Sequence, residues 1–397
     1  MEPNAPIDPP APAPNPEGPR AYVPALPTLW PRMLWQRRRT EPVFPFDAPT
    51  VRYFYFARNA VWLAVKALGL EGYEVLVPAY HHGVEVEALI DAGAQVRFFR
   101  VDSRMRPDLE DLERKVGPRT RGVYLIHYLG FPGPAAEVRA IADRHHLAFI
   151  EDCALSLLSA SGQRPLGQLG DASVFCFYKT LPVPHGGALV MGGGQPMGLP
   201  EPLVPPRVST ARHLASALLM NAELRAGAAG RGLRRTLRAL GRRAAHATGA
   251  LNVATGTAHF ERAHSGLGIS PLALRLAQAQ DAAAIVAARR RNYFLLLGRL
   301  RERAAPVFGS VPAGVAPLFY PLRLRDPEAV AERLAARGVE TVAFWRTGHP
   351  ACDLAGYPEV SALRRGVLEI PIHQDLTPAA AARVADAVAL AMDEVGA

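Results

Sequence analysis

The chain contains very little lysine. Only three of its 45 lysine and arginine residues are lysine: Lys66, Lys115 and Lys179. Arginine stays charged at any working pH and cannot serve as a nucleophilic amine, so a retained lysine reflects either chance or a need for its amine. Lys66 and Lys115 are typical of helix-surface charges. Lys179 lies between two apolar segments, where burial would lower the pKa of its amine. A strand-end lysine that reaches solvent is an equally good interpretation of this segment alone.

Cysteine is also scarce, and Cys153, Cys176 and Cys352 lack the spacing of metal ligands. Their odd number indicates a reducing compartment without a disulfide framework, and we expect no metal site. No apolar run approaches the roughly 20 residues of a membrane span. The N-terminus lacks the charged segment followed by an apolar segment that is typical of a signal peptide. With 49% hydrophobic and 20% charged residues, the composition is that of an ordinary globular protein, which we expect in the cytoplasm.

The formal net charge is +9, and much of the excess lies in residues 207–243. No zinc-finger or RNA-binding motif accompanies this basic segment, so we expect no nucleic-acid partner. A solvated helix face is the favoured interpretation. A weak contact between 207–243 and an anionic membrane surface is the alternative.

The composition also changes along the chain. Residues 1–20 are rich in proline and alanine and are predicted to be disordered. Residues 21–50 carry aromatic side chains between prolines and are predicted to form an extended arm. We expect a large domain over 51–290, interrupted by a basic helical insert at 192–265, and a small domain over 291–397.

Short apolar strands alternate with amphipathic helices from residue 59 onward. The predicted strands are 74–78, 96–101, 122–127, 147–151, 173–177, 187–191, 318–324, 341–345 and 367–372. The predicted helices are 59–68, 83–92, one that begins at Pro107 and Asp108, 134–146, a long stretch over 270–300, 327–337 and 377–394. This alternation predicts an α/β fold with a mainly parallel sheet that is covered on both faces.

In such sheets, ligands bind at the carboxyl ends of the strands. That rule selects the segments Tyr80-His81-His82 and His127-Tyr128, together with Asp152 and Lys179. An aspartate directly after a buried strand is by itself a helix cap or a ligand contact. Paired with a strand-end lysine, it suggests pyridoxal phosphate, which needs an amine, a carboxylate for its ring nitrogen, a stacking group and a helix N-terminus for its phosphate.

Six segments in order carry a resemblance to a known family: 56–70, 74–102, 108–133, 146–156, 164–192 and 366–388. They resemble the DegT/DnrJ/EryC1/StrS family, the sugar aminotransferases of pyridoxal-phosphate fold type I. The similarity covers roughly 50–190 and 265–397. It implies a large, mainly parallel sheet domain with a smaller C-terminal α/β domain, pyridoxal 5'-phosphate as cofactor, and a homodimer.

The resemblance also implies roles for individual residues. Lys179 would bond to the cofactor and move the substrate proton as the catalytic residue. Asp152 would pair with the pyridine nitrogen, and His82 falls where the family has an aromatic that stacks on the ring. Asn59 and Ala60 would receive the phosphate through backbone N–H groups.

The chain departs from the family pattern at several positions and resembles a divergent member. Arg58-Asn59 replaces the Gly-Thr of the phosphate loop, and Arg58 would contact the phosphate directly. Leu155 replaces the usual glutamine. The phosphate-binding serine has no clear equivalent, and Cys176 or Tyr178 would stand near its place. The segment 265–270 replaces an Asn-Tyr-Arg motif that the family uses across its subunit interface.

Three residues of the small domain are predicted to contact substrate, namely Trp345, Arg346 and His349. Arg346 would bind a carboxylate or phosphate in bidentate fashion, whereas a surface arginine beside a buried tryptophan explains the same segment as well. His373 is a weaker candidate.

These observations predict an aminotransferase that moves an amino group from an amino acid donor, with glutamate favoured, to a keto sugar or related carbonyl acceptor. Such an enzyme would serve polysaccharide or secondary-metabolite biosynthesis. Two alternatives stay open. One is another pyridoxal-phosphate reaction, such as dehydration or oxidation, and the other is a non-catalytic sensor or assembly protein on the same fold.

Overall fold

The structure is a computed structural model that describes residues 22–36, 41–194, 200–226, 230, 232, 259–343 and 345–396. The predicted tail 1–20 lies outside the described residues. So does most of the predicted insert beyond residue 226, including the arginine-rich segment 233–243.

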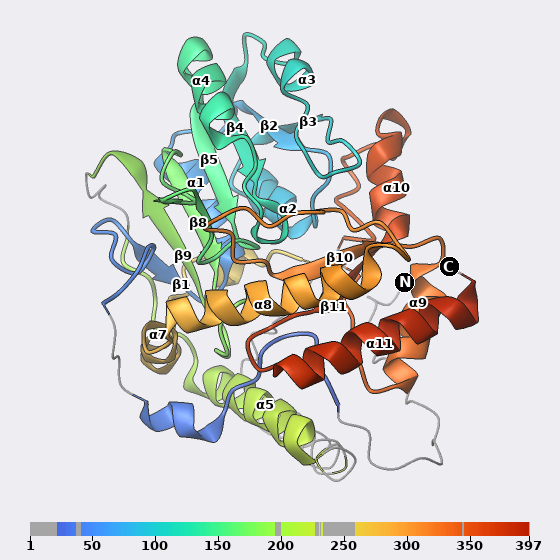
Figure 1. The fold of residues 1–397 in the computed structure, drawn as a ribbon. Helices are drawn as coiled ribbons and strands as arrows, with labels where there is room; N and C mark the ends of the chain where they lie inside the picture. The colour runs from blue at the N-terminus through green and yellow to red at the C-terminus, as the bar shows by residue number, and fades with distance from the viewer. Residues whose placement is uncertain are drawn as a thin grey trace, which may run out of the picture.

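A seven-stranded sheet forms the centre of the larger part of the molecule (Figure 1). Its order is β1-β9-β8-β5-β4-β2-β3, and the pairs β2·β3, β2·β4, β4·β5 and β5·β8 are parallel. The strands are β1 (Arg52–Phe54), β2 (Glu74–Pro78), β3 (Gln95–Phe99), β4 (Thr120–Ile126), β5 (Ala148–Cys153), β8 (Ala172–Cys176) and β9 (Gly187–Met191). The predicted mainly parallel α/β sheet is confirmed, with β9 and β1 added antiparallel at one edge.

Helices cover both faces of this sheet. On one side α1 (Ala57–Ala67) packs against α2 (Val84–Asp91), β8 and β9, and on the other α4 (Ala135–His145) packs against β4, β5 and α3 (Leu109–Arg114). Successive residues of a strand point to opposite faces. On β4, Tyr124 and Ile126 therefore join the core under α1 and α2, whereas Val123 and Leu125 join the core under α4.

A second, two-stranded antiparallel sheet pairs β10 (Phe319–Arg323) with β11 (Val367–Pro371). Helices α8 (Ala282–Leu300), α9 (Pro327–Ala336) and α11 (Pro378–Val395) pack on it and on one another, and α10 (Pro358–Gly366) leads into β11. The predicted border between large and small domains at residues 290 and 291 falls inside α8, and the division into domains stays a prediction.

Two predicted elements differ from the structure. The predicted strand 341–345 is wrong. Of its described residues only Val342 pairs, in an isolated bridge with Glu369, and the chain turns at Trp345, whose φ is +63°. The predicted long helix over 270–300 is two helices, α7 (Pro271–Gln278) and α8. Asp281 ends the continuity because its carboxylate accepts a hydrogen bond from the Ala284 amide and so begins a new helix.

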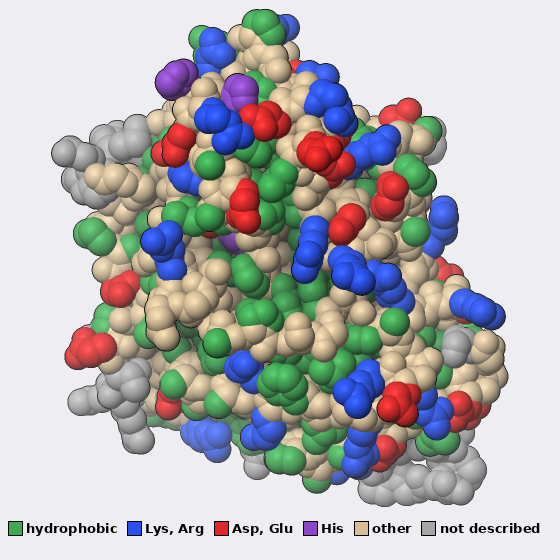
Figure 2. Space-filling view, turned by 45° about the horizontal axis from the view of Figure 1, so that its top comes forward, with side chains coloured by type: hydrophobic (Ala, Val, Ile, Leu, Met, Phe, Trp, Pro, Cys, Tyr) green, Lys and Arg blue, Asp and Glu red, His purple; other side chains and the backbone are tan. Residues whose placement is uncertain are grey.

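The predicted arm runs from the second sheet toward the first. Val23 makes a parallel bridge with Val339, and Asp375 accepts hydrogen bonds from the Thr28 amide and the Trp30 indole. Helix α5 (Arg207–Ala226) lies beside it, and the Asn221 side chain donates to the Thr28 hydroxyl. In the described part of the chain, no helix is both long and apolar enough to cross a membrane. On the face in Figure 2, basic and acidic side chains are interspersed.

Four histidines have lowered pKa values because they are buried. The pKa of His81 and of His185 is lowered to about 3, and that of His82 and of His373 to about 4. An unfolded histidine has a pKa near 6.5, so between pH 6.5 and 4 the unfolded chain binds protons that the folded chain does not. These residues therefore make folding less favourable as the pH falls through this range.

We expect each such histidine to remove about 2 kcal/mol of unfolding free energy between pH 7.5 and pH 5. The variant His185→Phe keeps a ring stacked on Tyr55, whose centroid lies 3.8 Å away, and removes the titrating group. Its denaturant midpoint should fall less on acidification than that of the wild type. His146→Asn, at an exposed helix end with φ +54°, is the control for the loss of a histidine that is not buried. Equal acid sensitivity of His185→Phe and wild type would contradict this account.

Candidate active site

A cavity of about 360 Å³ lies at the carboxyl ends of β5 and β8, on the side of the sheet that α1 covers. It is lined by seven of the residues predicted from the sequence: Arg58, His82, Asp152, Cys176, Tyr178, Lys179 and Trp345. The other walls come from distant parts of the chain, namely Leu26 of the arm, Met220 of α5, and Glu340 and Val342 near the second sheet.

Asp152 is the buried carboxylate of this cavity and is 6% exposed. Its Oδ2 accepts a hydrogen bond from the Tyr124 hydroxyl (2.7 Å) and its Oδ1 accepts one from the Ala154 amide (2.8 Å). Burial raises the pKa of Asp152, and the neighbouring Glu85 carboxylate raises it further, while Lys179 opposes the shift. A carboxylate in this setting gains stability from any cation that enters the cavity.

Glu85 and Tyr124 are functional candidates that the sequence analysis missed. Glu85 is 6% exposed, lines the cavity and has a pKa raised by its burial. Its Oε1 accepts a hydrogen bond from the His82 amide at 2.7 Å. Tyr124 could have been found from the sequence. It lies two residues before the end of a strand and therefore on the same face as Ile126. Glu85 gave no such signal, since an acidic residue in a first helical turn is ordinary.

Lys179 follows β8 on a tight turn. The Thr180 amide donates to the Phe177 carbonyl (3.0 Å), and the chain then returns to the sheet through Gly186 and Gly187. Gly186 has φ +143°, where a Cβ would lie 2.8 Å from the Phe177 ring. At Gly187 a Cβ would lie 2.5 Å from the Ala57 nitrogen, so only glycine lets β9 begin against the first turn of α1.

His82 lines the cavity near Lys179. Burial lowers the pKa of its imidazole to about 4, and the charges of Lys179, Arg364 and Arg58 contribute to the shift. Its ring is therefore neutral at pH 7. Its Nδ1 is buried without a hydrogen-bond partner among the described residues, so a ligand in the cavity would find a polar atom to bond.

The N-terminus of α1 opens into the cavity without a side-chain cap, and Phe56, Ala57 and Arg58 line the wall. The Arg58 guanidinium lies 3.9 Å from the Phe56 ring centroid, and burial lowers the pKa of Arg58. An arginine stays cationic at pH 7, so this corner combines a positive side chain with a helix N-terminus, a setting that suits an anion.

Asn59 and Ala60 lie in the first turn of α1 but do not line the cavity. The Asn59 side chain donates to the carbonyl of His264 (2.7 Å), and its amide donates to the carbonyl of Phe56. Their predicted phosphate contacts stay predictions.

Trp345 reaches the cavity from the second sheet and is 6% exposed. Its ring centroid lies 4.9 Å from that of Tyr80 and 5.4 Å from that of Tyr128, and its carbonyl accepts a hydrogen bond from Arg364. These contacts hold it at φ +63°, a conformation that is unfavourable for a bulky residue. Its Nε1 is buried without a hydrogen-bond partner among the described residues. Strain combined with an unused donor is typical of a ligand-binding position.

The other two substrate candidates do not line the cavity. Arg346 is exposed and forms an ion pair with Glu328. The His349 amide donates to Nε2 of the buried His81 (3.0 Å), and this bond joins the segment after Trp345 to the loop after β2. Contact of either residue with a substrate stays a prediction.

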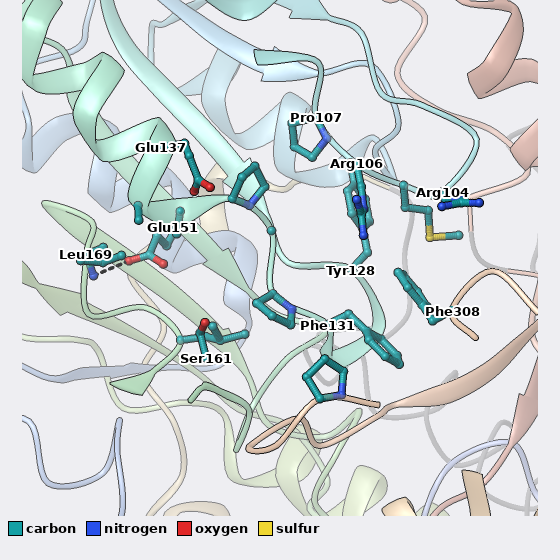
Figure 3. A pocket seen from close by; sticks show the side chains of 18 of the residues that line it. Arg104, Arg106, Pro107, Tyr128, Phe131, Glu137, Glu151, Ser161, Leu169 and Phe308 are labelled. Atoms are coloured by element: carbon teal, nitrogen blue, oxygen red, sulfur yellow. Dashed lines mark hydrogen bonds between the residues drawn. The ribbon is translucent and has the colours of Figure 1, made fainter. Parts of the chain in front are cut away.

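A larger cavity, of about 1180 Å³, lies on the other face of the sheet (Figure 3). Glu151, the neighbour of Asp152, faces it, and Arg104, Arg106 and Glu137 also lie along its wall. Glu151 is fully engaged, because its carboxylate accepts hydrogen bonds from the amides of Leu169 and Gly170 and is bonded to His127. The predicted strand-end residue His127 is therefore a structural partner.

Residues 57–195 match the model of the DegT/DnrJ/EryC1/StrS aminotransferase family. This segment, about a third of the chain, resembles that family. The matched segment holds Lys179, Asp152, His82 and Arg58. The resemblance inferred from the sequence is confirmed over residues 57–195, and over 265–397 it stays a prediction.

Two curated relatives illustrate the match. GDP-perosamine synthase of Vibrio cholerae is 33% identical over 135 residues, which cover 33% of this chain and 37% of that protein. The dTDP-4-dehydro-2,3,6-trideoxy-D-glucose 4-aminotransferase of Saccharopolyspora spinosa is 36% identical over 136 residues, which cover 33% and 34%. The matching segment thus spans about a third of each relative.

The likeness in fold extends further than the likeness in sequence. A putative sugar aminotransferase of Streptococcus pneumoniae, solved in a PLP form, aligns with a TM-score of 0.68 over 94% of this chain and 99% of that one, at 13% identity. The chain therefore has the fold of this solved aminotransferase, and the predicted fold type is confirmed.

The contact between β9 and α1 can be tested by substitution. We expect Gly187→Ala to lower the unfolding free energy by about 1–3 kcal/mol, because its Cβ would overlap the backbone of Ala57 and Phe56. Gly298→Ala, in the interior of α8 with open space around it, is the matched control and should raise stability by about 0.5–1 kcal/mol. Denaturant unfolding measures both, and a neutral Gly187→Ala would refute the close approach.

Proposed function

We propose that this chain is a pyridoxal-phosphate-dependent aminotransferase that moves an amino group from an amino acid donor, with glutamate favoured, to a keto sugar or related carbonyl acceptor. The observation that supports this most is the common cavity of Lys179, Asp152, His82 and Arg58, all within the segment that matches the family model. The two relatives named above are, by name, a perosamine synthase and a sugar 4-aminotransferase. We further propose a cytoplasmic homodimer.

The residues of the cavity fit the cofactor. Asp152 is a buried carboxylate with a raised pKa, and a protonated ring nitrogen is the cation that would relieve it. The uncapped N-terminus of α1 and Arg58 suit a phosphate group. His82 offers a neutral ring with an unused nitrogen.

Each side chain then has a task. Pyridoxal phosphate, when bound, supplies an aldehyde and a ring that withdraws electrons from the substrate. The Lys179 amine would hold the cofactor and, once a substrate amine replaces it, take up and return the proton at the carbon that bears the amino group. Asp152, kept in place by Tyr124, would hold the ring nitrogen in its protonated state.

The end of the cavity away from the sheet would receive the substrate. Leu26, Met220 and Val342 are apolar and would exclude water from the reacting amine. The Trp345 indole would donate a hydrogen bond to an oxygen of the substrate, and the Glu340 carboxylate would accept one from a hydroxyl.

Absorbance tests the proposed function directly. We expect the wild type to acquire the visible absorbance of bound pyridoxal phosphate and to lose it when glutamate is added. Lys179→Ala should show no such absorbance and should lose amino transfer by a factor on the order of 10³ or more. Lys179→Arg keeps the charge but has no nucleophilic amine, so it is the matched control and should behave like Lys179→Ala.

Two results would contradict the proposal. A wild type that takes up no cofactor would favour a non-catalytic protein on this fold. A wild type whose absorbance persists with every amino donor would favour another reaction, such as dehydration or oxidation.

The unused donor of Trp345 gives a second test. Trp345→Phe keeps a ring between Tyr80 and Tyr128 but removes the N–H group. We expect the KM of one substrate to rise about 3- to 10-fold, as for the loss of one hydrogen bond, with no loss of stability. If the indole binds no ligand, both KM values should stay unchanged.

A further inference from the structure

The turn that carries Lys179 is held from outside the large sheet. Thr180 is 2% exposed, and its carbonyl oxygen accepts two side-chain hydrogen bonds. One comes from Nη2 of Arg289 (3.2 Å) and the other from Nε2 of Gln374 (2.9 Å). Because the Thr180 amide also closes the turn onto Phe177, the residue after Lys179 is held at both its backbone amide and its backbone carbonyl.

Arg289 reaches this carbonyl from α8 and is 1% exposed. Its Nε donates to Oε1 of Gln374 (3.0 Å), and its Nη1 donates to the carbonyls of Pro317 (3.3 Å) and Leu318 (2.9 Å). Burial lowers its pKa to about 9, so the guanidinium is still charged at pH 7. Burying a charged side chain costs folding free energy. The bonds to Pro317 and Leu318 account only for the connection between α8 and β10, and they leave the bond to Thr180 to be explained.

Gln374 lies on a segment that is itself fixed. Its neighbour Asp375 accepts hydrogen bonds from Thr28 and Trp30 of the arm, and its neighbour His373 is bonded to the Pro24 carbonyl. The Gln374 side chain is therefore presented to Thr180 from an anchored backbone, and it accepts from Arg289 while it donates to Thr180. The two side chains and the carbonyl form a closed triangle of hydrogen bonds.

We propose that Arg289 and Gln374 are positioning residues for Lys179. They hold the turn so that the amine stays aimed into the cavity, and neither lines the cavity itself. This inference rests on the proposed function of Lys179, whose amine condenses with an aldehyde and releases one water. Loss of the triangle lets the amine sample unproductive positions, so its reaction with the aldehyde slows. The groups that would hold the ring and the phosphate, Asp152 and Arg58, lie on other segments and would be unaffected.

The experiment compares two probes, of which only one must react with the Lys179 amine in order to be captured. Pyridoxal phosphate must react with Lys179, and reduction with borohydride followed by mass spectrometry counts the modified lysine. Pyridoxamine phosphate has the same ring and phosphate but no aldehyde, so its Kd reports the remaining contacts. In Gln374→Met, which keeps the length of the side chain, we expect capture of pyridoxal phosphate to slow about 3- to 10-fold, while the Kd of pyridoxamine phosphate stays within about twofold.

The control is Gln280→Met. Gln280 is also half-buried, and its Nε2 donates to a carbonyl at 2.8 Å, that of Leu276, so the same substitution removes the same kind of bond away from the lysine turn. It should leave both probes unchanged. Arg289→Lys keeps the charge with fewer donors and should slow capture at least as much as Gln374→Met. If Arg289→Lys does not fold, Gln374→Met decides.

The outcomes separate this inference from the proposed function. A wild type that never captures pyridoxal phosphate would overturn the proposed function and the positioning role with it. A wild type that captures it, with Gln374→Met at the same rate, would overturn the positioning role alone. Equal losses for both probes would also overturn it, since they indicate general loosening of the cavity.

Discussion

The negative charge of Asp152, withdrawn from water at the end of β5, is the constraint on which this site depends. Two hydrogen bonds, from Tyr124 and Ala154, stabilise the carboxylate, but Glu85 adds a second acidic group beside it. Buried like charges are unfavourable, and cations must balance them. Lys179 helps to do so, and a protonated cofactor ring would do more. The same electrostatics thus disfavours folding of the empty site and prepares it to bind a cation.

Successive side chains of a β-strand point to opposite faces of the sheet, so the adjacent carboxylates of Glu151 and Asp152 lie in different environments. Asp152 points to the α1 side and keeps part of its bonding capacity for the cavity. Glu151 points to the α4 side, where His127 and the amides of Leu169 and Gly170 use its carboxylate fully. A shift of β5 by one residue would exchange these environments. The parallel pairing of Ile126 with Asp152 and of Asp152 with Val174 fixes the register.

The sequence predicted the parts of the site that belong to the parallel sheet. Lys179, Asp152 and His82 each follow a strand, and the carboxyl ends of parallel strands meet at one edge. Contacts between segments that are far apart in the sequence could not be predicted in this way. Met220 and Glu340 reach the cavity from outside the sheet, and no local pattern marks them. The apolar segment 341–345 has the composition of a strand, but the bond from Arg364 and the rings of Tyr80 and Tyr128 turn it at Trp345.

The anchoring of the arm has a consequence for how the molecule is assembled. Thr28 and Asp375 are 347 positions apart in the chain, so the arm is synthesised long before the residue that anchors it. Contacts of such long range form slowly because a large loop must close before they contribute. We therefore expect the large sheet to fold with Leu26 still absent from the cavity wall. The cavity then closes as a late step of folding, after the turn that precedes α11 has left the ribosome.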